Sequence, residues 1–171
     1  GIVDYKGVTA TYGKLIQAAG GEIRTNARVK RIHRMNDEIV LETPGGEVHC
    51  KNLINCGGLQ SDRIARMAGV DPKLQIVPFR GEYYELVPEA HPLVKNLIYP
   101  VPDPRFPFLG VHFTRMVLGG VEAGPNAVLS FKREGYSHWS FDLGDTLTFA
   151  TYLGFWRMAL KYWQMSVGEF Y

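Results

Sequence analysis

The sequence predicts an α/β (α+β) fold, and three observations support this class. Helix-like and strand-like apolar patterns alternate over the first 70 residues of the 171-residue chain. Within that stretch, residues 52–69 combine a short apolar strand, a turn of small residues and a helix. Beyond residue 70, alternating apolar residues are interrupted by clustered prolines, which is typical of short strands joined by loops.

The first 50 residues are expected to form a helix followed by strands. Residues 8–19 carry apolar side chains at helical spacing, and Gly20 and Gly21 end that pattern. Residues 22–25 are a candidate strand. A three-stranded meander is expected next, with strands in residues 29–35, 39–42 and 47–50 and a turn at 44–46.

The segment 52–69 is the most informative part of the chain. Leu53 and Ile54 are expected to form a short buried strand that leads into a small-residue turn at 56–58, and a helix starts near Ser61 or Asp62. Glycines let a ligand approach the backbone, and a helix N-terminus attracts phosphate. Strand–glycine–helix turns are also ordinary connections, so these residues alone leave both interpretations open.

The second half of the chain is expected to contain strands, loops and a final helix. A long strand is predicted over residues 75–87, interrupted at Arg80 and Gly81. Further predictions are a hairpin of residues 108–114 and 116–121 that turns at Thr114 and Arg115, a turn at 124–127, and an aromatic-rich helix over 147–165.

Composition excludes several classes of function. The net charge is +2 and no basic run is interleaved with aromatic residues, which argues against nucleic-acid binding. The only cysteines, Cys50 and Cys56, form neither a disulfide framework nor a metal-ligand pattern, and the five histidines are scattered. No apolar run is long enough for a transmembrane segment, and no signal peptide is visible.

Several motifs carry a resemblance to a known family. Residues 1–5, 55–63 and 78–84 resemble flavin-dependent oxidoreductases of the D-amino-acid oxidase type. Residues 110–115, 124–129 and 132–136 narrow the resemblance to the L-2-hydroxyglutarate oxidase/dehydrogenase family. Each motif is weak alone, but six in this order make the resemblance specific. The start at Gly1 and the end at Tyr171 indicate an internal fragment.

The resemblance implies a fold, a cofactor and a reaction. Residues 1–74 would be part of a Rossmann-like FAD domain, residues 75–141 a mixed or antiparallel substrate-binding sheet, and residues 142–171 an aromatic-rich helical segment. The parent enzyme would oxidise L-2-hydroxyglutarate to 2-oxoglutarate and pass electrons to oxygen or a quinone. The phosphate-binding GxGxxG loop would lie upstream, so the chain alone is expected to bind FAD poorly. A cytoplasmic location, or one peripheral to the inner membrane, is expected in a bacterium, and a mitochondrial one in a eukaryote.

His112 is the candidate catalytic base. Oxidation of a 2-hydroxy acid needs a base near the hydroxyl, and an imidazole titrates near neutral pH. The alternative is a histidine that is merely packed or solvated on a strand.

Four residues are candidates for substrate binding. Arg80 and Arg115 match a dicarboxylate, because a guanidinium binds a carboxylate bidentately, although a surface arginine paired with an acidic neighbour is the alternative. Tyr83 is expected to line the pocket and the adjacent tyrosine to lie on the opposite face of the strand. Asn126 is a candidate donor to substrate or flavin, or a simple turn residue.

The candidate cofactor residues lie in two places. The resemblance puts Val29 against the adenine ring and the turn near the pyrophosphate and ribitol; the turn residues are Asn55, Cys56, Gly57, Gly58 and Leu59. Gly57 stands where relatives usually have alanine, which should loosen the turn slightly. Cys56 is interpreted as a small packing residue because no base partner is apparent.

Two other functions remain open at this point. An FAD-dependent amino-acid oxidase or dehydrogenase would share the fold but need different substrate-contacting residues. A non-catalytic binding domain would use the aromatic stripe between Tyr152 and Trp163 as a contact surface.

Overall fold

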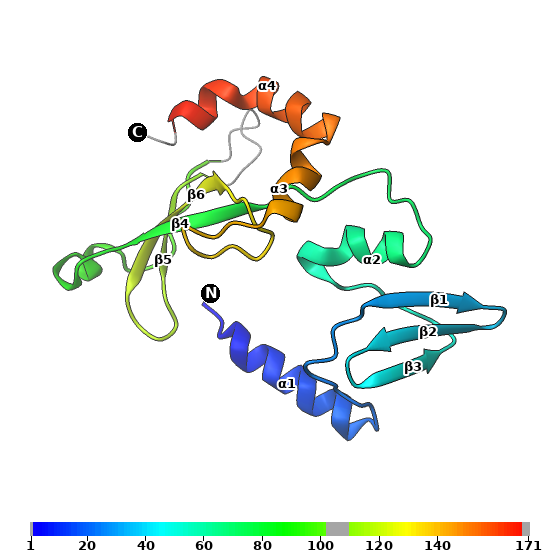
Figure 1. Ribbon diagram of the computed structural model, residues 1–171. Helices are drawn as coiled ribbons and strands as arrows, with labels where there is room; N and C mark the ends of the chain where they lie inside the picture. The colour runs from blue at the N-terminus through cyan, green and yellow to red at the C-terminus, as the bar shows by residue number, and fades with distance from the viewer. Residues whose placement is uncertain (1, 102–109, 169–171) are drawn as a thin grey trace. The chain divides into compact units, whose positions relative to one another are not determined.

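The computed structural model describes residues 2–101 and 110–168 of the chain, and it divides into two compact units. The N-terminal unit is Tyr5–Ile76, and the C-terminal unit is Val77–Tyr171 together with Gly1–Asp4. The described residues combine helices with two three-stranded antiparallel sheets, which confirms the predicted fold class (Figure 1).

The N-terminal unit holds two helices and one sheet. Its elements are α1 (Tyr5–Ala18), β1 (Arg31–Met35), β2 (Glu38–Thr43), β3 (Gly46–Cys50), the 3-10 turn η1 (Gly58–Gln60) and α2 (Ser61–Met67). The predicted first helix, the meander and the helix after the glycine turn are all confirmed. The alternation of apolar residues sets the register of the meander, because a slip of one residue would turn every side chain to the other face.

One face of the meander and the residues at the end of α2 line a common cavity. Ile32 and Ile39 lie on this face, and a cavity of about 150 Å³ separates them from Ala68 and Val70. The opposite face carries Val40, which is buried although charged side chains surround it. The meander therefore has an apolar side toward the end of α2 and a polar side.

Two predicted strands of this unit do not form. Residues 22–25 are irregular, and so are Leu53 and Ile54; the Ile54 side chain is 85% exposed. A strand requires a neighbour for its backbone hydrogen bonds, and β1, β2 and β3 pair only with one another. Apolar character alone was therefore a misleading signal at these positions.

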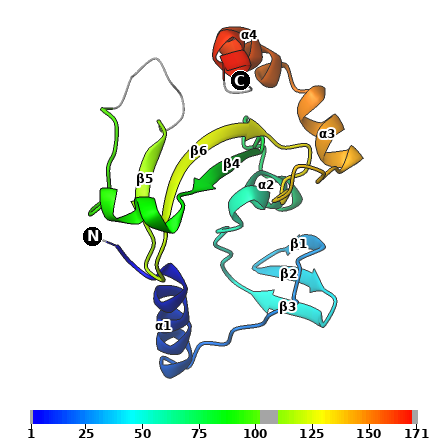
Figure 2. The same ribbon diagram turned by 90° about the vertical axis from the view of Figure 1, so that its left-hand side faces the viewer.

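The C-terminal unit contains the second sheet. Its elements are β4 (Phe79–Glu85), the 3-10 helix η2 (Pro88–Leu93), β5 (His112–Arg115), β6 (Val121–Leu129), α3 (Leu143–Ala150) and α4 (Leu153–Gly168). The strand order is β4-β6-β5, and these strands lie side by side in both views (Figures 1 and 2). Arg80 and Gly81 pair with β6, so the predicted interruption of the strand at these two residues is wrong.

The predicted turn at residues 124–127 is wrong, because these residues lie inside the central strand β6. Gly124 and Pro125, joined by a cis peptide bond, form a bulge opposite the single residue Tyr83 of β4. Proline has no backbone N–H to donate, and a bulge leaves such a residue out of the ladder. A Gly-Pro-Asn sequence that usually signals a turn is therefore compatible with a strand here.

The β5–β6 hairpin exists, but its turn lies later than predicted. Arg115 is the last residue of β5, and the turn comprises residues 116–120. Gly119 and Gly120 have φ values of 100° and 89°, which other residues adopt at a cost. Part of the predicted first strand, residues 108–109, falls outside the described residues.

The predicted helix over 147–165 is two helices separated at Thr151 and Tyr152. α3 starts earlier than predicted because Asp142 caps it: its Oδ1 accepts a hydrogen bond from the Asp145 backbone N–H at 2.8 Å. At the other end, Trp156 Nε1 of α4 donates to the Ala150 carbonyl at 2.7 Å. The buried Phe149 ring contacts Phe155 across this break, with ring centres 5.0 Å apart.

Candidate active site

His112 opens β5 and is 8% exposed. Its Nδ1 lies 3.1 Å from the carbonyl oxygen of Gly110. A carbonyl only accepts hydrogen bonds, so this contact requires the proton on Nδ1 and leaves the Nε2 lone pair free in the neutral ring. The ring stacks on Tyr99, with centroids 4.5 Å apart and an interplanar angle of 24°. The imidazole is therefore held by a hydrogen bond at one nitrogen and by a stacked ring on one face.

Tyr83 projects from the same face of the sheet as His112. His112 pairs with Gly124, and a Cβ at Gly124 would lie 2.7 Å from Tyr83 Cδ1. Directly paired residues in antiparallel strands share a face, so the Tyr83 ring and the imidazole flank the bare backbone of Gly124. Tyr83 is 50% exposed and Tyr84 75%. This face therefore combines a hydroxyl-bearing ring, a glycine and a histidine.

Arg80 lies on the opposite face, together with Glu82. The two alternate with Tyr83 along β4, and Arg80 Nε donates to Glu82 Oε1 at 3.1 Å. Arg80 Nη1 also donates to the Ser137 carbonyl at 2.8 Å, and the arginine side chain is only 12% exposed. Glu82, which the sequence reasoning did not single out, therefore neutralises this arginine.

Asn126 and Arg115 also lie away from the His112 face. Asn126 pairs with Glu82 and shares its face. Arg115 lies three positions after His112 on β5 and so faces the other way, and its Nη1 donates to the Val94 carbonyl at 2.8 Å. The structure thus brings His112 and Tyr83 together and does not bring Arg80, Arg115 or Asn126 to the same face.

The glycine turn of the N-terminal unit is organised by Asn55. Its Oδ1 accepts from the Gly57 backbone N–H at 3.1 Å, and its Nδ2 donates to the Ser61 carbonyl at 2.8 Å. A Cβ on Gly57 would lie 2.4 Å from Ile64 Cδ1, so glycine here lets the side chain of α2 approach the turn. The turn is therefore tightened by Asn55 and closely packed on α2, whereas a loosened turn was expected.

Gly58 gives the turn an open edge. Its φ is +52°, a conformation that L residues rarely adopt, and no atom lies within 4 Å of the position of a Cβ. Within the described residues its backbone N–H has no hydrogen-bond partner. A free N–H beside open space suits a phosphate oxygen, so this turn fits the pyrophosphate of a dinucleotide cofactor.

The remaining candidate cofactor residues are accessible to differing degrees. Cys56 is exposed and carries a free thiol, and Leu59 is 38% exposed. Val29 is half-buried in the irregular segment that precedes β1. Cys56 and Leu59 are thus exposed to solvent at the turn, and Val29 lies outside the two sheets.

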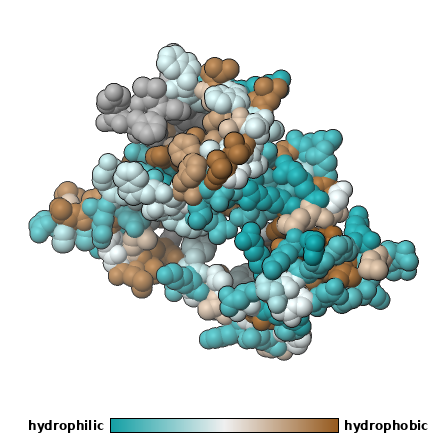
Figure 3. All heavy atoms as spheres, in the orientation of Figure 1, coloured by the Kyte–Doolittle hydropathy of each residue, from teal (hydrophilic) through white to brown (hydrophobic). Residues whose placement is uncertain are grey.

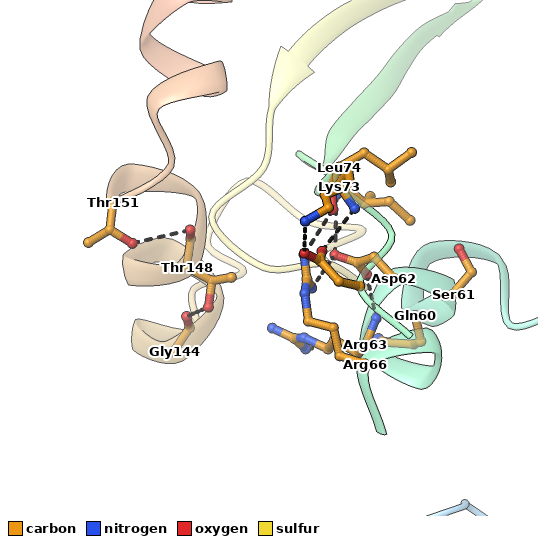
Figure 4. Close-up of polar contacts among 12 residues, drawn as sticks. Gln60, Ser61, Asp62, Arg63, Arg66, Lys73, Leu74, Gly144, Thr148 and Thr151 are labelled. Carbon is orange, nitrogen blue, oxygen red and sulfur yellow. Dashed lines mark hydrogen bonds and ion pairs between the residues drawn. The ribbon is translucent and has the colours of Figure 1, made fainter. Parts of the chain in front are cut away.

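Asp62 is a buried carboxylate whose function in the fold was not anticipated. Its side chain is fully buried and accepts from Arg66 Nη1 at 3.1 Å and from the Ile76 backbone N–H at 3.3 Å (Figure 4). Arg66 Nη2 in turn donates to the Leu74 carbonyl at 2.8 Å. The acid four residues before a basic residue on α2 was the available signal. This network holds the segment after α2 against the helix.

Arg133 is a second buried charged residue that sequence reasoning missed. It is 4% exposed, and its backbone N–H donates to Asp145 Oδ2 at 2.8 Å. The contact joins the loop after β6 to the first turn of α3. Arg133 lies in the motif of residues 132–136, but that motif gave no indication that the residue is buried.

Apolar side chains remain exposed on α1 and α4. No residue of α1 is buried, and Tyr12 and Leu15 are 64% and 59% exposed. On α4 an exposed stripe at helical spacing comprises Leu153, Trp156, Leu160 and Trp163. Apolar residues also reach the surface at several places in the space-filling view (Figure 3). These are the faces that a further protein segment or a partner would cover.

The described part of the chain offers neither a metal cluster nor a membrane-spanning helix. Its histidine, cysteine, aspartate and glutamate side chains form no group of three suited to a metal ion. Nor does any helix there have the length and apolar character needed to cross a membrane.

The sequence as a whole matches a known protein family. Residues 1–165 match the model of the family described as DAO, FAD dependent oxidoreductase. The chain belongs to this family of FAD-dependent oxidoreductases.

Individual relatives share a more specific name. The chain is 48% identical over 172 residues to L-2-hydroxyglutarate dehydrogenase of Indibacter alkaliphilus, with 100% of the chain and 43% of the relative aligned. Identity to the L-2-hydroxyglutarate dehydrogenase of Escherichia coli K12 is 47%, over 99% of the chain and 40% of the relative. The human mitochondrial L-2-hydroxyglutarate dehydrogenase is 42% identical, over 100% of the chain and 40% of its own length. The chain thus spans about two fifths of the length of these relatives.

Proposed function

We propose that the protein containing this chain oxidises L-2-hydroxyglutarate to 2-oxoglutarate, with FAD as the hydride acceptor. The observation that carries this proposal is the 48% identity along the whole chain to a protein named for that substrate. The buried histidine at the start of β5 agrees with it, since a base is what the chemistry requires.

His112 is the proposed base. Oxidation of a secondary alcohol removes a proton from the hydroxyl and a hydride from the carbon. The free Nε2 lone pair of His112 would receive the proton, because Nδ1 already faces the Gly110 carbonyl. FAD, when bound, supplies the hydride acceptor.

Tyr83 is proposed to contact the substrate from the same face. A phenol hydroxyl donates a hydrogen bond to a carboxylate, and Tyr83 is half exposed beside Gly124. Arg80, Arg115 and Asn126 remain proposed substrate contacts. The guanidinium groups of Arg80 and Arg115 would first have to leave Glu82 and the Val94 carbonyl.

The glycine turn is proposed to hold the FAD pyrophosphate. The free backbone N–H of Gly58 would donate to a phosphate oxygen, and Asn55, Cys56, Gly57 and Leu59 would line the approach. Val29 would contact the adenine through its backbone. This binding is proposed for the protein at the full length of its relatives.

Flavin absorbance in the full-length protein tests the reaction. Anaerobic addition of L-2-hydroxyglutarate is expected to bleach the flavin band, and D-2-hydroxyglutarate and amino acids are not. Bleaching by amino acids alone would identify an amino-acid oxidoreductase of the same fold. A full-length protein without flavin would instead favour a binding domain.

His112→Ala is the first mutational test. Loss of a general base lowers turnover by about a hundredfold or more, so this variant should lose turnover but keep its flavin content. His33→Ala, at an exposed histidine of the N-terminal unit, is the matched control and should leave turnover unchanged. Near-normal turnover by His112→Ala would remove His112 from the mechanism.

The electron acceptor and the location are proposed from the same resemblance. Electrons are expected to pass to oxygen or to a quinone. The cytoplasm, with contact to the inner membrane, is the proposed location in a bacterium, and the mitochondrion in a eukaryote. Reoxidation of the reduced protein by oxygen and by a soluble quinone, compared at equal concentration, distinguishes the acceptors.

A further inference from the structure

Tyr99 and His112 are cross-strand neighbours. Ile98 and Phe113 form an isolated antiparallel bridge, in which the Ile98 N–H donates to the Phe113 carbonyl at 3.0 Å and the reverse bond is 2.9 Å. In an antiparallel pair the next residue of one strand faces the preceding residue of the other. Tyr99 therefore stands opposite His112, on the same face.

The tyrosine ring covers one side of the imidazole. The two rings stack with centroids 4.5 Å apart and planes inclined by 24°. Tyr99 is 55% exposed whereas His112 is 8% exposed, so the tyrosine stands between the imidazole and solvent. A stacked neighbour restricts rotation of the imidazole about its Cβ–Cγ bond, since a rotated ring would collide with it.

Gly110 provides a second contact on the edge of the imidazole. Its carbonyl oxygen lies 3.1 Å from His112 Nδ1. A Cβ at Gly110 would come within 2.8 Å of Pro100 Cγ, so glycine allows the backbone to pack this closely on the residue after Tyr99. The stacking ring and the accepting carbonyl are therefore parts of one packed arrangement.

We propose that Tyr99 is a positioning residue, which together with the Gly110 carbonyl holds His112 in one ring orientation and one tautomer, with Nε2 as the proton acceptor. This inference rests on the proposed function. Because the partner of Nδ1 is a backbone atom, no side-chain substitution removes it directly. Tyr99 is the side chain through which the orientation of His112 is set.

The hydroxyl of Tyr99 is not required for this role. Its oxygen makes no hydrogen bond to the described residues, so stacking is the contact that matters. Tyr99→Phe keeps an aromatic ring and should rescue function, whereas Tyr99→Leu removes the stack. Tyr84→Leu, at a tyrosine of β4 that is 75% exposed, is the matched control.

The experiment uses the full-length flavin-loaded protein. Tyr99→Leu is expected to lower kcat by roughly tenfold, with KM and flavin content nearly unchanged, since a misplaced catalytic group loses rate. Tyr99→Phe and Tyr84→Leu should stay within about twofold of the unmodified protein, the ordinary scatter for changes that leave the reacting groups in place. Nitrogen-15 NMR of labelled histidine should show His112 protonated at Nδ1, and a mixture of tautomers in Tyr99→Leu.

Each contrary outcome has a distinct meaning. Normal turnover and a single tautomer in Tyr99→Leu would overturn the positioning role alone. A large loss in Tyr99→Phe would overturn it as well, because the hydroxyl would then act directly. Full turnover by His112→Ala would instead show that His112 is not the base. The stacking of Tyr99 on His112 would then have no role in catalysis.

Discussion

At the scale of single residues, Asp62 shows how a buried charge is made tolerable. Its carboxylate is shielded from solvent, yet it accepts bonds from Arg66 and from the backbone of Ile76. A buried carboxylate without such partners would carry a large desolvation cost. Each partner also fixes a different piece of chain, so the residue organises the loop after α2.

Asp62→Asn is expected to destabilise the protein by about 1–3 kcal/mol, because an amide replaces one accepting oxygen and leaves Arg66 without its ion pair. Chemical denaturation measures the loss, and amide exchange at Ile76 should accelerate. Asp71→Asn is the control: Asp71 pairs with Lys73 at 2.7 Å, but both are exposed, and such pairs contribute about 0–1 kcal/mol. Equal losses in the two variants would contradict the role of burial.

At the scale of elements, the polar face of the meander carries two groups with shifted pKa values, His49 and Glu42. His49 Nδ1 lies 3.0 Å from Glu38 Oε2, and this hydrogen bond raises the pKa of His49 above its ordinary value of 6.5. The hydrogen bonds from Arg31 and then from His33 hold the pKa of Glu42 below 4.5. The raised pKa of His49 affects stability on the alkaline side, and the lowered pKa of Glu42 affects stability on the acid side.

The stability of the meander should be greatest between about pH 4.5 and 6.5, the ordinary pKa values of the two groups. The contribution of His49 to stability is complete below pH 6.5 and is lost as pH rises through the higher pKa of His49 in the folded protein. The contribution of Glu42 to stability is complete above pH 4.5 and is lost as pH falls through the lower pKa of Glu42 in the folded protein. Denaturation midpoints across pH measure this. His49→Gln should remove the decline on the alkaline side, and an unchanged decline would assign it to other groups.

The bulge of β6 is a second element with a testable cause. A Cβ on Gly124 would lie 2.7 Å from the Glu82 carbonyl oxygen, a backbone atom held in the β4–β6 pairing. Gly124→Ala is therefore expected to cost about 1–3 kcal/mol, the usual range for overpacking. Gly45→Ala, at a turn with only a 3.9 Å contact, is the control and should be nearly neutral in thermal unfolding. A neutral Gly124→Ala would mean that the two strands separate easily.

At the scale of the whole molecule, few apolar side chains are buried. Among the described residues these are Val40, Val94, Val121 and Phe149. In contrast, the apolar face of α1 and the α4 stripe are largely exposed. The relatives are more than twice as long as the chain, and a protein of that length would have further segments to cover these faces.

Tryptophan fluorescence tests this explanation. The chain has three tryptophans, and Trp139, Trp156 and Trp163 are 94%, 51% and 58% exposed. A soluble quencher should therefore reach all of them in the 171-residue chain alone, and Trp156 and Trp163 should be protected in a protein of the relatives' full length. Single-tryptophan variants separate the signals. Equal quenching in both proteins would instead favour the α4 stripe as a surface for a partner.

Local patterns were sufficient for much of the N-terminal unit. The meander follows from alternating residues around Pro44, and α2 follows from its periodic apolar positions after Gly58. The strands predicted at residues 22–25 and 53–54 do not form, because a strand needs a partner and the sequence of a segment does not specify which strand it pairs with. Within the candidate site, His112 and Tyr83 could be singled out from the sequence, but Glu82 and Tyr99 could not. Glu82 matters because it pairs with Arg80, and Tyr99 because it stacks on His112.

The fold class and the family could be predicted from the sequence, because both depend on the order of local patterns and motifs along the chain. Which side chains share a face became known from the paired strands alone. The pairing put Tyr83 and Tyr99 on the His112 face, and it placed Arg80 with Glu82 on the other. The physical reason is that sheet pairing is non-local: the bulge opposite Tyr83 and the bridge at Ile98 exist only once distant strands meet.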